Sequence, residues 1–121
     1  MPPSLEEHLR WARTFEDDFL SIFNAKVFNW ATVALFYSAL HYIQAFLVQR
    51  GLGEMVENHP LRNRLVDTIS ELKDISTSYR HLHDTGWACR YRGRAVKRED
   101  IEGLLRPDFV RVRDRVKSLL R

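Results

Sequence analysis

The segment from Val27 to Arg50, VFNWATVALFYSALHYIQAFLVQR, is apolar on almost every face of the helix that it would form. A helix that is apolar all round has to be buried, either in a lipid bilayer or in the middle of a helical bundle. The segment nevertheless contains Tyr37, His41 and Gln44. Because a polar group buried without a partner costs about 1–3 kcal/mol, we expect these side chains to be paired or to serve a function.

A membrane span is the less favoured alternative for this segment. Its apolar stretch, residues 31–48, approaches the roughly 20 residues that a spanning helix needs. However, Ser38, His41 and Gln44 lie near its centre, where a histidine is costly in a bilayer. Residues 1–11 are charged and helical in pattern, unlike a signal peptide. We therefore expect no membrane span and a cytoplasmic protein.

The composition is that of a globular protein. The chain has 121 residues, of which 45% are hydrophobic and 12% aromatic, so we expect a single domain over residues 1–121. Cys89 is the only cysteine, which excludes an internal disulfide and favours a reducing compartment. The net charge is only +3, but the segment RYRGRAVKR, residues 90–98, has five basic residues and no acid. The positive charge is therefore unevenly distributed along the chain.

The remaining patterns are helical. Ser4 and Glu7 form a capping box at the start of a first helix that runs to about residue 23. Gly51 suits the end of the central helix, and the loop after it, residues 51–59, leads to a further helix. Asn58 or His59 could cap that helix, with Pro60 at its first position.

The C-terminal half continues the same periodicity. From Leu61 the apolar residues recur at steps of three and four, in one long helix or in two with a break near residues 76–78, where Ser and Thr compete with the helical backbone. A basic loop surrounds Gly93, and Pro107 is expected to start the last helix. The sequence therefore predicts an all-α, up-and-down bundle of four to five helices around a central apolar helix at about residues 25–50.

Three elements, in this order, carry a resemblance to a known family. They are FYSALHYIQAFL in the central helix, HPLR at residues 59–62, and YRHLHDTGWACRY at residues 79–91. In these elements the chain resembles the HEPN superfamily, whose members are small helical bundles. The resemblance covers about half of the chain, residues 27–92. It implies a homodimer that binds RNA or nucleotides in a prokaryotic defence or toxin–antitoxin system, with a cognate antitoxin or nucleotidyltransferase protein as a partner.

The chain departs from the family in its catalytic motif. Catalytic HEPN ribonucleases, which need no metal, carry an Arg followed by a His after about four to six intervening residues. No Arg–His pair here has that spacing: His59 lies nine residues after Arg50 and precedes Arg62, and His83 lies three residues after Arg80. The family's catalytic residues therefore cannot be transferred. Members without the motif are usually taken as binding or scaffolding proteins.

Several residues remain as candidates for a site. His59, Arg62 and Arg64 fall in and just after the first turn of a helix, where an anion is favoured, although a cap with solvated charges explains them as well. If the protein cleaves RNA, we expect His59 as the acid/base and Arg62, with Arg90 or Arg92, to stabilise the phosphate. The basic segment, flanked by Trp87, combines charge with stacking surface, as an RNA contact requires, although a solvated basic loop with Trp87 in the core explains it equally well. Its candidate residues are Arg90, Tyr91, Arg92, Arg94, Lys97 and Arg98.

The other polar residues favour structural roles. Tyr37 and His41 are an i, i+4 pair beside small residues, which is more typical of close helix packing with a hydrogen-bonded core histidine than of chemistry. Arg80, His81 and His83 are expected on a solvent-exposed strip. We expect no cofactor and no metal site. Two functions remain: an RNA- or nucleotide-binding protein, which could also be a metal-independent ribonuclease, and a non-catalytic helical protein–protein interaction module.

Overall fold

The computed structural model describes residues 2–53 and 59–121. Its helical elements confirm the all-α prediction, and the described residues form no strand. In chain order they are α1 (Leu5–Asn24), α2 (Phe28–Gln49), α3 (His59–Thr68), the 3₁₀ segment η2 (Ser70–Ile75), α4 (Ser76–Tyr91), α5 (Arg98–Asp100), the π segment η3 (Ile101–Leu105) and α6 (Arg106–Leu119).

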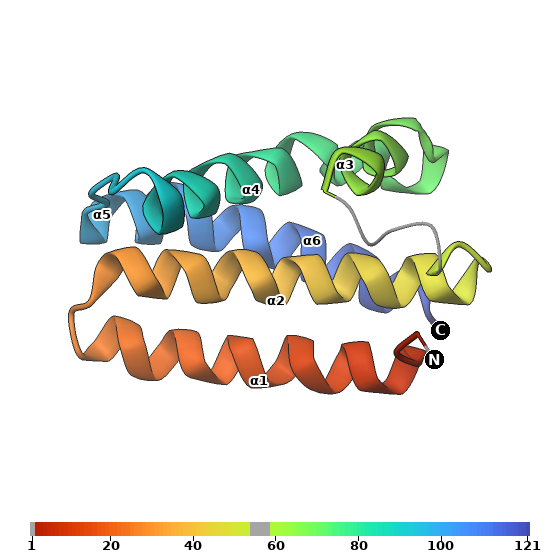
Figure 1. Ribbon diagram of the computed structural model, residues 1–121, viewed down its shortest axis with the longest axis horizontal. Helices are drawn as coiled ribbons and strands as arrows, with labels where there is room; N and C mark the ends of the chain where they lie inside the picture. Colours follow the sequence, from red (N-terminus) through yellow and green to blue (C-terminus); the bar gives the residue numbers. More distant parts are fainter. Residues whose placement is uncertain (1, 54–58) are drawn as a thin grey trace.

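The long helices run side by side, with α2 in the middle (Figure 1). Helices α1 and α2 are antiparallel neighbours. Helix α4 lies on the opposite side of α2, and α6 lies behind α2 and α4 in this view. Both ends of the chain lie at the same end of the bundle. This is the up-and-down arrangement around a central helix that the sequence predicts.

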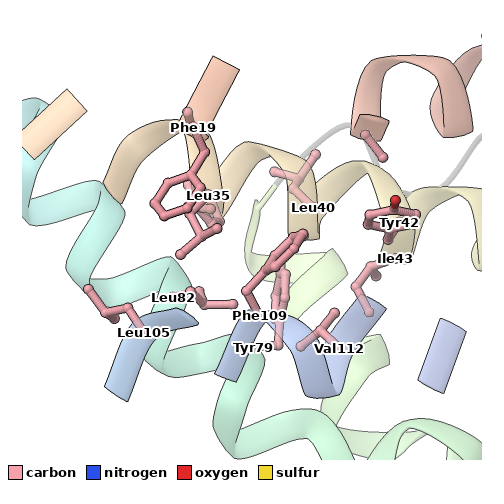
Figure 2. Packing of buried hydrophobic residues seen from close by; sticks show 14 of the residues in the cluster. Phe19, Leu35, Leu40, Tyr42, Ile43, Tyr79, Leu82, Leu105, Phe109 and Val112 are labelled. Carbon is pink, nitrogen blue, oxygen red and sulfur yellow. The ribbon is translucent and has the colours of Figure 1, made fainter. Parts of the chain in front are cut away.

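Helix α2 supplies most of the core. It is long and apolar enough to cross a membrane, yet 83% of its most apolar 18-residue window is buried by the rest of the chain. Leu35 and Ile43 are fully buried on α2, and Tyr79 of α4 and Val112 of α6 meet them from the other side (Figure 2). The burial of its apolar side chains by three neighbouring helices is the main stabilising contribution to this fold.

The contact between α1 and α2 is close because small side chains lie in it. Ala12 and Ala39 are fully buried, and the Ser38 hydroxyl donates a hydrogen bond of 2.6 Å to the carbonyl oxygen of Ala12. The capping box between Ser4 and Glu7 is present at the start of α1, as predicted. The close packing predicted for the stripe that contains Ser38 is thus confirmed.

The boundaries of α2 and α3 agree with the sequence in part. Gly51 follows α2 with φ of +76°, the left-handed conformation that a helix-ending glycine adopts without a Cβ clash. His59 is the first residue of α3 and Pro60 the second. The alternative cap, Asn58, lies outside the described residues.

The break in the third predicted helix lies earlier than expected. It occupies Ile69, which is extended, and the six residues of η2, so that α4 begins at Ser76 instead of breaking there. Leu72 and Ile75 of η2 are buried, and burial of these two side chains favours the tighter 3₁₀ turn at this point.

The last helix begins within one residue of the predicted start at Pro107, but helical turns that were not predicted precede it. The chain is helical from Arg98 through α5 and η3 into α6, and Pro107 is the second residue of α6. Inside an α-helix a proline ring meets the carbonyl of the residue four before it, which here is Gly103. The wider π turn of η3 contains Gly103 and directly precedes α6, so the helix accommodates the proline without ending.

Candidate functional site

A pocket of about 400 Å³ opens between the start of α3 and the second half of α4. This volume is within the range of small-molecule sites. We call it the histidine pocket; its lining residues are His59, Pro60, Asn63, His83, Asp84, Trp87, Ala88 and Arg92. Two of the sequence candidates, His59 and Arg92, are therefore brought together, although they are far apart in the chain.

His59 is held by the buried arginine beneath it. The Arg62 guanidinium, whose residue is only 4% exposed, lies 2.8 Å from Nδ1 of His59. A guanidinium can only donate, so Nδ1 accepts and the ring proton is on Nε2. Burial lowers the pKa of His59, and the nearby charges of Arg62 and His83 lower it further. His59 is thus a neutral imidazole at neutral pH with an N–H group to offer.

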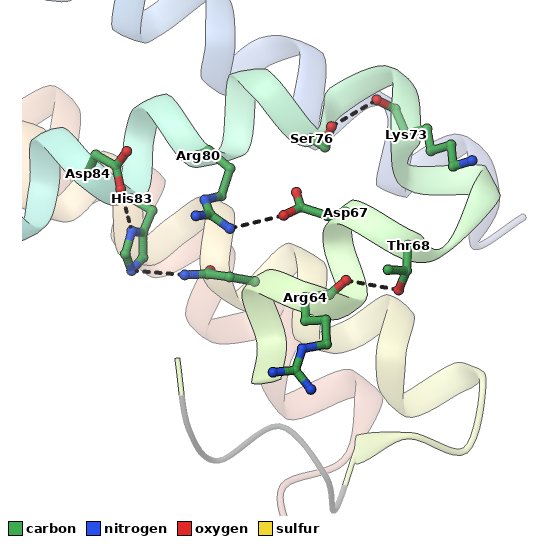
Figure 3. A network of polar contacts seen from close by, with 9 residues as sticks. Arg64, Asp67, Thr68, Lys73, Ser76, Arg80, His83 and Asp84 are labelled. Carbon is green, nitrogen blue, oxygen red and sulfur yellow. Dashed lines mark hydrogen bonds and ion pairs between the residues drawn. The ribbon is translucent and has the colours of Figure 1, made fainter. Parts of the chain in front are cut away.

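His83 is held in the opposite tautomer. Its Nδ1 lies 2.9 Å from a carboxylate oxygen of Asp84, which accepts, so the proton is on Nδ1 (Figure 3). Its Nε2 accepts a hydrogen bond of 3.4 Å from the amide of Asn63. The side chain of His83 is 14% exposed. The expectation that His83 lies on a solvent-exposed strip is therefore wrong, because α3 covers this part of α4.

Aromatic rings form one wall of the histidine pocket. The rings of His83 and Trp87 stack at 18° with centroids 6.1 Å apart, and Trp87 contacts Tyr91 at 4.5 Å. His59 meets Trp87 edge-on at 5.4 Å. Since His83, Trp87 and Tyr91 recur every four residues, they form one continuous stripe along α4.

Two residues of the basic segment, Arg92 and Arg90, lie at the pocket and at the aromatic stripe beside it. Arg92 lines the pocket and is exposed. Arg90 donates a hydrogen bond to the hydroxyl of Tyr37. Its guanidinium lies over the rings of Tyr37 and Tyr91, at 5.3 and 5.1 Å from their centroids. Arg90 thereby fixes the aromatic stripe of α4 against α2.

The other predicted basic residues lie elsewhere. Arg64 is exposed on α3, and its side chain points away from His83 (Figure 3). Arg94 and Lys97 are exposed in the loop before α5, where the backbone N–H of Lys97 donates to Asp100. The guanidinium of Arg98 lies over the rings of Phe23 and Phe28 near the α1–α2 turn. None of these four residues lines the histidine pocket.

Tyr37 and His41 are half-buried, not fully buried as the sequence suggested. Nδ1 of His41 lies 3.1 Å from Nδ1 of His8 on α1, and the His41 ring stacks on Phe15 with centroids 5.6 Å apart. Burial, together with the charges of His8 and Arg62, lowers the pKa of His41 to about 4. The prediction of a histidine hydrogen-bonded to a neighbour is confirmed.

An apolar groove lies between α1 and the first half of α2. It is lined by Phe15, Asp18, Ile22, Trp30, Val33, Ala34, Tyr37 and Arg90. Large hydrophobic side chains near the α1–α2 turn are unusually exposed: Trp30 at 55%, Val27 at 45% and Leu20 at 43%. Exposed apolar surface of this kind is typical of protein contacts.

Sequence reasoning missed three residues of these sites. Asn63 and His83 join the histidine pocket, and His8 pairs with His41. The four-residue spacing of His83, Trp87 and Tyr91 places them on one face of a helix and could have indicated the histidine pocket. No local pattern could have found His8, because its pairing depends on how α1 is placed against α2.

Comparison with known proteins adds no identification, since no protein-family model and no curated protein matches the chain significantly. Within the described part of the chain, no group of three or more His, Cys, Asp or Glu side chains could hold a metal ion.

Proposed function

We propose that this protein binds single-stranded RNA or a nucleotide in the histidine pocket. The observation that carries the proposal is the convergence of His59, His83, Trp87 and Arg92 on one pocket from two helices. The pocket offers a stacking surface, ring N–H and acceptor groups, and a cation at its rim. Single-stranded RNA is recognised by this combination of aromatic stacking and phosphate contacts.

The roles follow from the geometry. A base stacks on Trp87, whose ring forms the wall of the pocket, and a phosphate lies against the Arg92 guanidinium and the Nε2–H of His59. Arg90 and Tyr91, next along the stripe, extend the contact to a neighbouring nucleotide. Arg64, Arg94, Lys97 and Arg98 contribute at most to the long-range attraction of RNA.

Binding of a labelled 2′-O-methyl oligouridylate at low salt tests the proposal, since this backbone cannot be cleaved. We expect Arg92→Ala to weaken binding and to reduce the slope of log affinity against log salt by about 0.7–1, as loss of one phosphate contact would. Loss of stacking in Trp87→Leu should cost about 1–3 kcal/mol, or roughly five- to 150-fold.

Arg64→Ala is the matched control, because it removes the same charge from the side of α3 that faces away from His83. It should change affinity much less than Arg92→Ala. Absence of binding to both the oligonucleotide and uridine monophosphate at low salt would refute the proposal.

A metal-independent ribonuclease is a second candidate, favoured by the opposite tautomers of the two pocket histidines. His83, oriented by Asp84, has its acceptor lone pair on Nε2. The long contact of 3.4 Å from Asn63 occupies this lone pair, so Nε2 can accept the proton of the RNA 2′-hydroxyl once the substrate replaces Asn63. The 2′-oxygen then attacks phosphorus and the bond to the 5′-oxygen breaks, with water protonating the leaving oxygen. His59 and Arg92 stabilise the charge on the phosphoryl oxygens. In this mechanism the general base is His83, whereas the sequence alone suggested His59.

Cleavage of unmodified RNA in the presence of a chelator tests this candidate. The expected products are a 2′,3′-cyclic phosphate and a 5′-hydroxyl. His83→Gln should abolish cleavage and retain binding, whereas His81→Gln, which alters a side chain that contacts Asp108 instead of the pocket, should cleave normally. RNA that stays intact with the purified wild type removes the enzyme and leaves a binding protein.

The wider setting of the proposal rests on the resemblance alone. An RNA-binding HEPN-like bundle would act as a cytoplasmic homodimer in a prokaryotic defence or toxin–antitoxin system, beside a cognate antitoxin or nucleotidyltransferase. Sedimentation of the purified protein tests the dimer, and the neighbouring genes test the setting.

The apolar groove favours the alternative, a non-catalytic interaction module. Trp30 is exposed at its edge, and Asp18 and Arg90 add charges of both signs. If the protein is such a module, Trp30→Ser should abolish binding to its partner or to a second copy, while Arg92→Ala should have no effect. An unchanged oligomeric state and an unchanged partner in Trp30→Ser would exclude the groove.

A further inference from the structure

A second pocket, of about 390 Å³, lies where the N-terminus of α1 meets the last turns of α2 and the buried side of α3. We call it the N-terminal pocket. Its polar lining comes from His8, His41, Gln44 and Arg62, and Trp11 lies beside them. Three separate helices therefore direct polar side chains to one place.

Three of these polar side chains are more than nine-tenths buried. The exposed fractions are 6% for His8, 9% for Gln44 and 4% for Arg62. The side chain of Gln44 lines this pocket together with the histidine pair and Arg62. Polar side chains that face a pocket can be satisfied there by a ligand or by water.

The chemistry of the lining favours an anion. The contact between the two Nδ1 atoms of His8 and His41, 3.1 Å apart, uses one N–H group. The ring that accepts in this contact carries its proton on Nε2 and can donate to a ligand. Gln44 adds amide N–H donors, and the Arg62 guanidinium adds a positive charge that opposes a metal ion. Trp11, 5.3 Å from the His41 ring, supplies a surface for a base.

Arg62 joins this pocket to the histidine pocket. It lines the N-terminal pocket and also donates to Nδ1 of His59 on the other side. Both pockets are thus built on the same plan, with two histidines and one tryptophan around the same arginine: His59, His83 and Trp87 in one, and His8, His41 and Trp11 in the other. Because Arg62 lines one pocket and contacts His59 of the other, we infer that the two pockets are neighbours that a single RNA strand can reach.

We propose that the N-terminal pocket is a second phosphate subsite, which holds the phosphodiester next to the nucleotide bound in the histidine pocket. This inference rests on the proposed RNA binding. The N-terminal pocket binds a phosphate of the same strand. Gln44 and the histidine pair donate hydrogen bonds to it, and Trp11 lies beside the attached base.

The subsite couples binding to proton uptake. Burial lowers the pKa values of both His8 and His41, and the positive charge of Arg62 on α3 lowers them further, while Glu7 on α1 opposes the effect at His8. A bound phosphate brings a negative charge beside the pair and raises both pKa values again. The pair therefore takes up a proton as the strand binds, and affinity should increase as the pH falls from 8 to 6.

Calorimetry with 2′-O-methyl triuridylate and uridine monophosphate tests the subsite. We expect the wild type to bind the trinucleotide at least tenfold more tightly than the mononucleotide. His41→Phe, which keeps a ring against Phe15, and Gln44→Leu, which keeps the volume, should reduce this ratio to threefold or less and leave mononucleotide binding unchanged. In buffers of different ionisation enthalpy at pH 6, the wild type should take up protons with the trinucleotide and His41→Phe should not.

The outcomes separate the two proposals. If the variants keep the wild-type ratio and proton uptake, the subsite is refuted and the histidine pocket stands. If they lose mononucleotide binding as well, the mononucleotide sits in the N-terminal pocket and the assignment as a second subsite is refuted. If the wild type binds neither ligand, both proposals fail. Imidazole NMR signals of His8 and His41 that respond to zinc and to no nucleotide would assign the pair to a metal ion instead.

Discussion

The guanidinium of Arg62 lies 2.8 Å from Nδ1 of His59. Arg62 is buried, with only 4% of its surface exposed. Its charge also lowers the pKa values of His8 and His41 and opposes the increase that burial causes at Tyr79. One buried cation thus acts on three of the five histidines of the chain. This arrangement keeps the imidazoles of His8, His41 and His59 neutral near pH 7 and available as hydrogen-bond donors and acceptors.

Removal of this charge should raise the pKa values of these three histidines. Arg62→Met keeps an unbranched apolar stem in the same space, so the positive charge is lost with little change in packing volume. We expect the imidazole resonances of His59, His8 and His41 to titrate at higher pH than in the wild type, as measured by NMR.

Arg62→Lys is the control for this experiment, because it keeps the charge and loses the planar fork. It should leave the three histidine pKa values much closer to those of the wild type. Titration of the Met variant at wild-type pH values would show that burial alone sets the protonation of both pockets.

Acid should destabilise the fold partly through His41. The pKa of His41 is about 4 in the folded protein, against 6.5 for an unperturbed histidine, so the unfolded chain binds more protons between these two values. The stabilisation is therefore complete above pH 6.5 and is lost as the pH falls toward 4. The lowered pKa values of His8 and His59 act in the same direction.

Thermal unfolding of His41→Phe isolates this contribution. Phenylalanine keeps the stack on Phe15 and cannot take up a proton, so the fall in Tm between pH 6.5 and 4 should be smaller than in the wild type. Equal falls in the two proteins would mean that carboxylate protonation alone accounts for the acid sensitivity.

The sequence predicted the bundle because its helices are specified locally. The unbroken apolar face pattern of α2, the capping box of Ser4 and Glu7 and the helix-ending Gly51 each act within a few residues, and each is found as predicted. The helical turns before Pro107 were not predicted, because they continue into α6 through the π turn of η3, which no simple periodicity reveals. Local signals thus determine where most helices begin and end, and the exceptions occur where a distortion absorbs the unfavourable residue.

The sites were less predictable because they form between helices. His59 and Arg62 were found through the first turn of α3, and their contact follows from a spacing of three residues. His83 faces them only because α3 crosses α4, and His8 meets His41 across the α1–α2 contact. The basic segment does not form one continuous surface, although the sequence suggested a single RNA contact. Arg90 lies on α4 and Arg92 directly at its end, whereas Arg98 lies over the rings of Phe23 and Phe28.

The contact between α2 and α4 depends on Gly86, which makes it a sensitive position for the whole bundle. A Cβ atom at Gly86 would lie 2.7 Å from the Cβ of Phe36, an atom fixed to the backbone of the central helix. Overpacking of this kind costs about 1–3 kcal/mol, and the better helix propensity of alanine returns at most about 1 kcal/mol. We expect Gly86→Ala to lower the free energy of unfolding, measured by urea denaturation, and to disturb the histidine pocket, because His83 and Trp87 flank Gly86 on α4.

Gly103→Ala is the matched control, because a Cβ atom there meets nothing within 4 Å. The same substitution in this helical residue should leave stability unchanged or raise it by up to about 1 kcal/mol. The two alanines should therefore change stability in opposite directions. If Gly86→Ala proved as stable as Gly103→Ala, α4 would be free to move away from Phe36, and the close approach of the two helices would not be needed to hold the histidine pocket together.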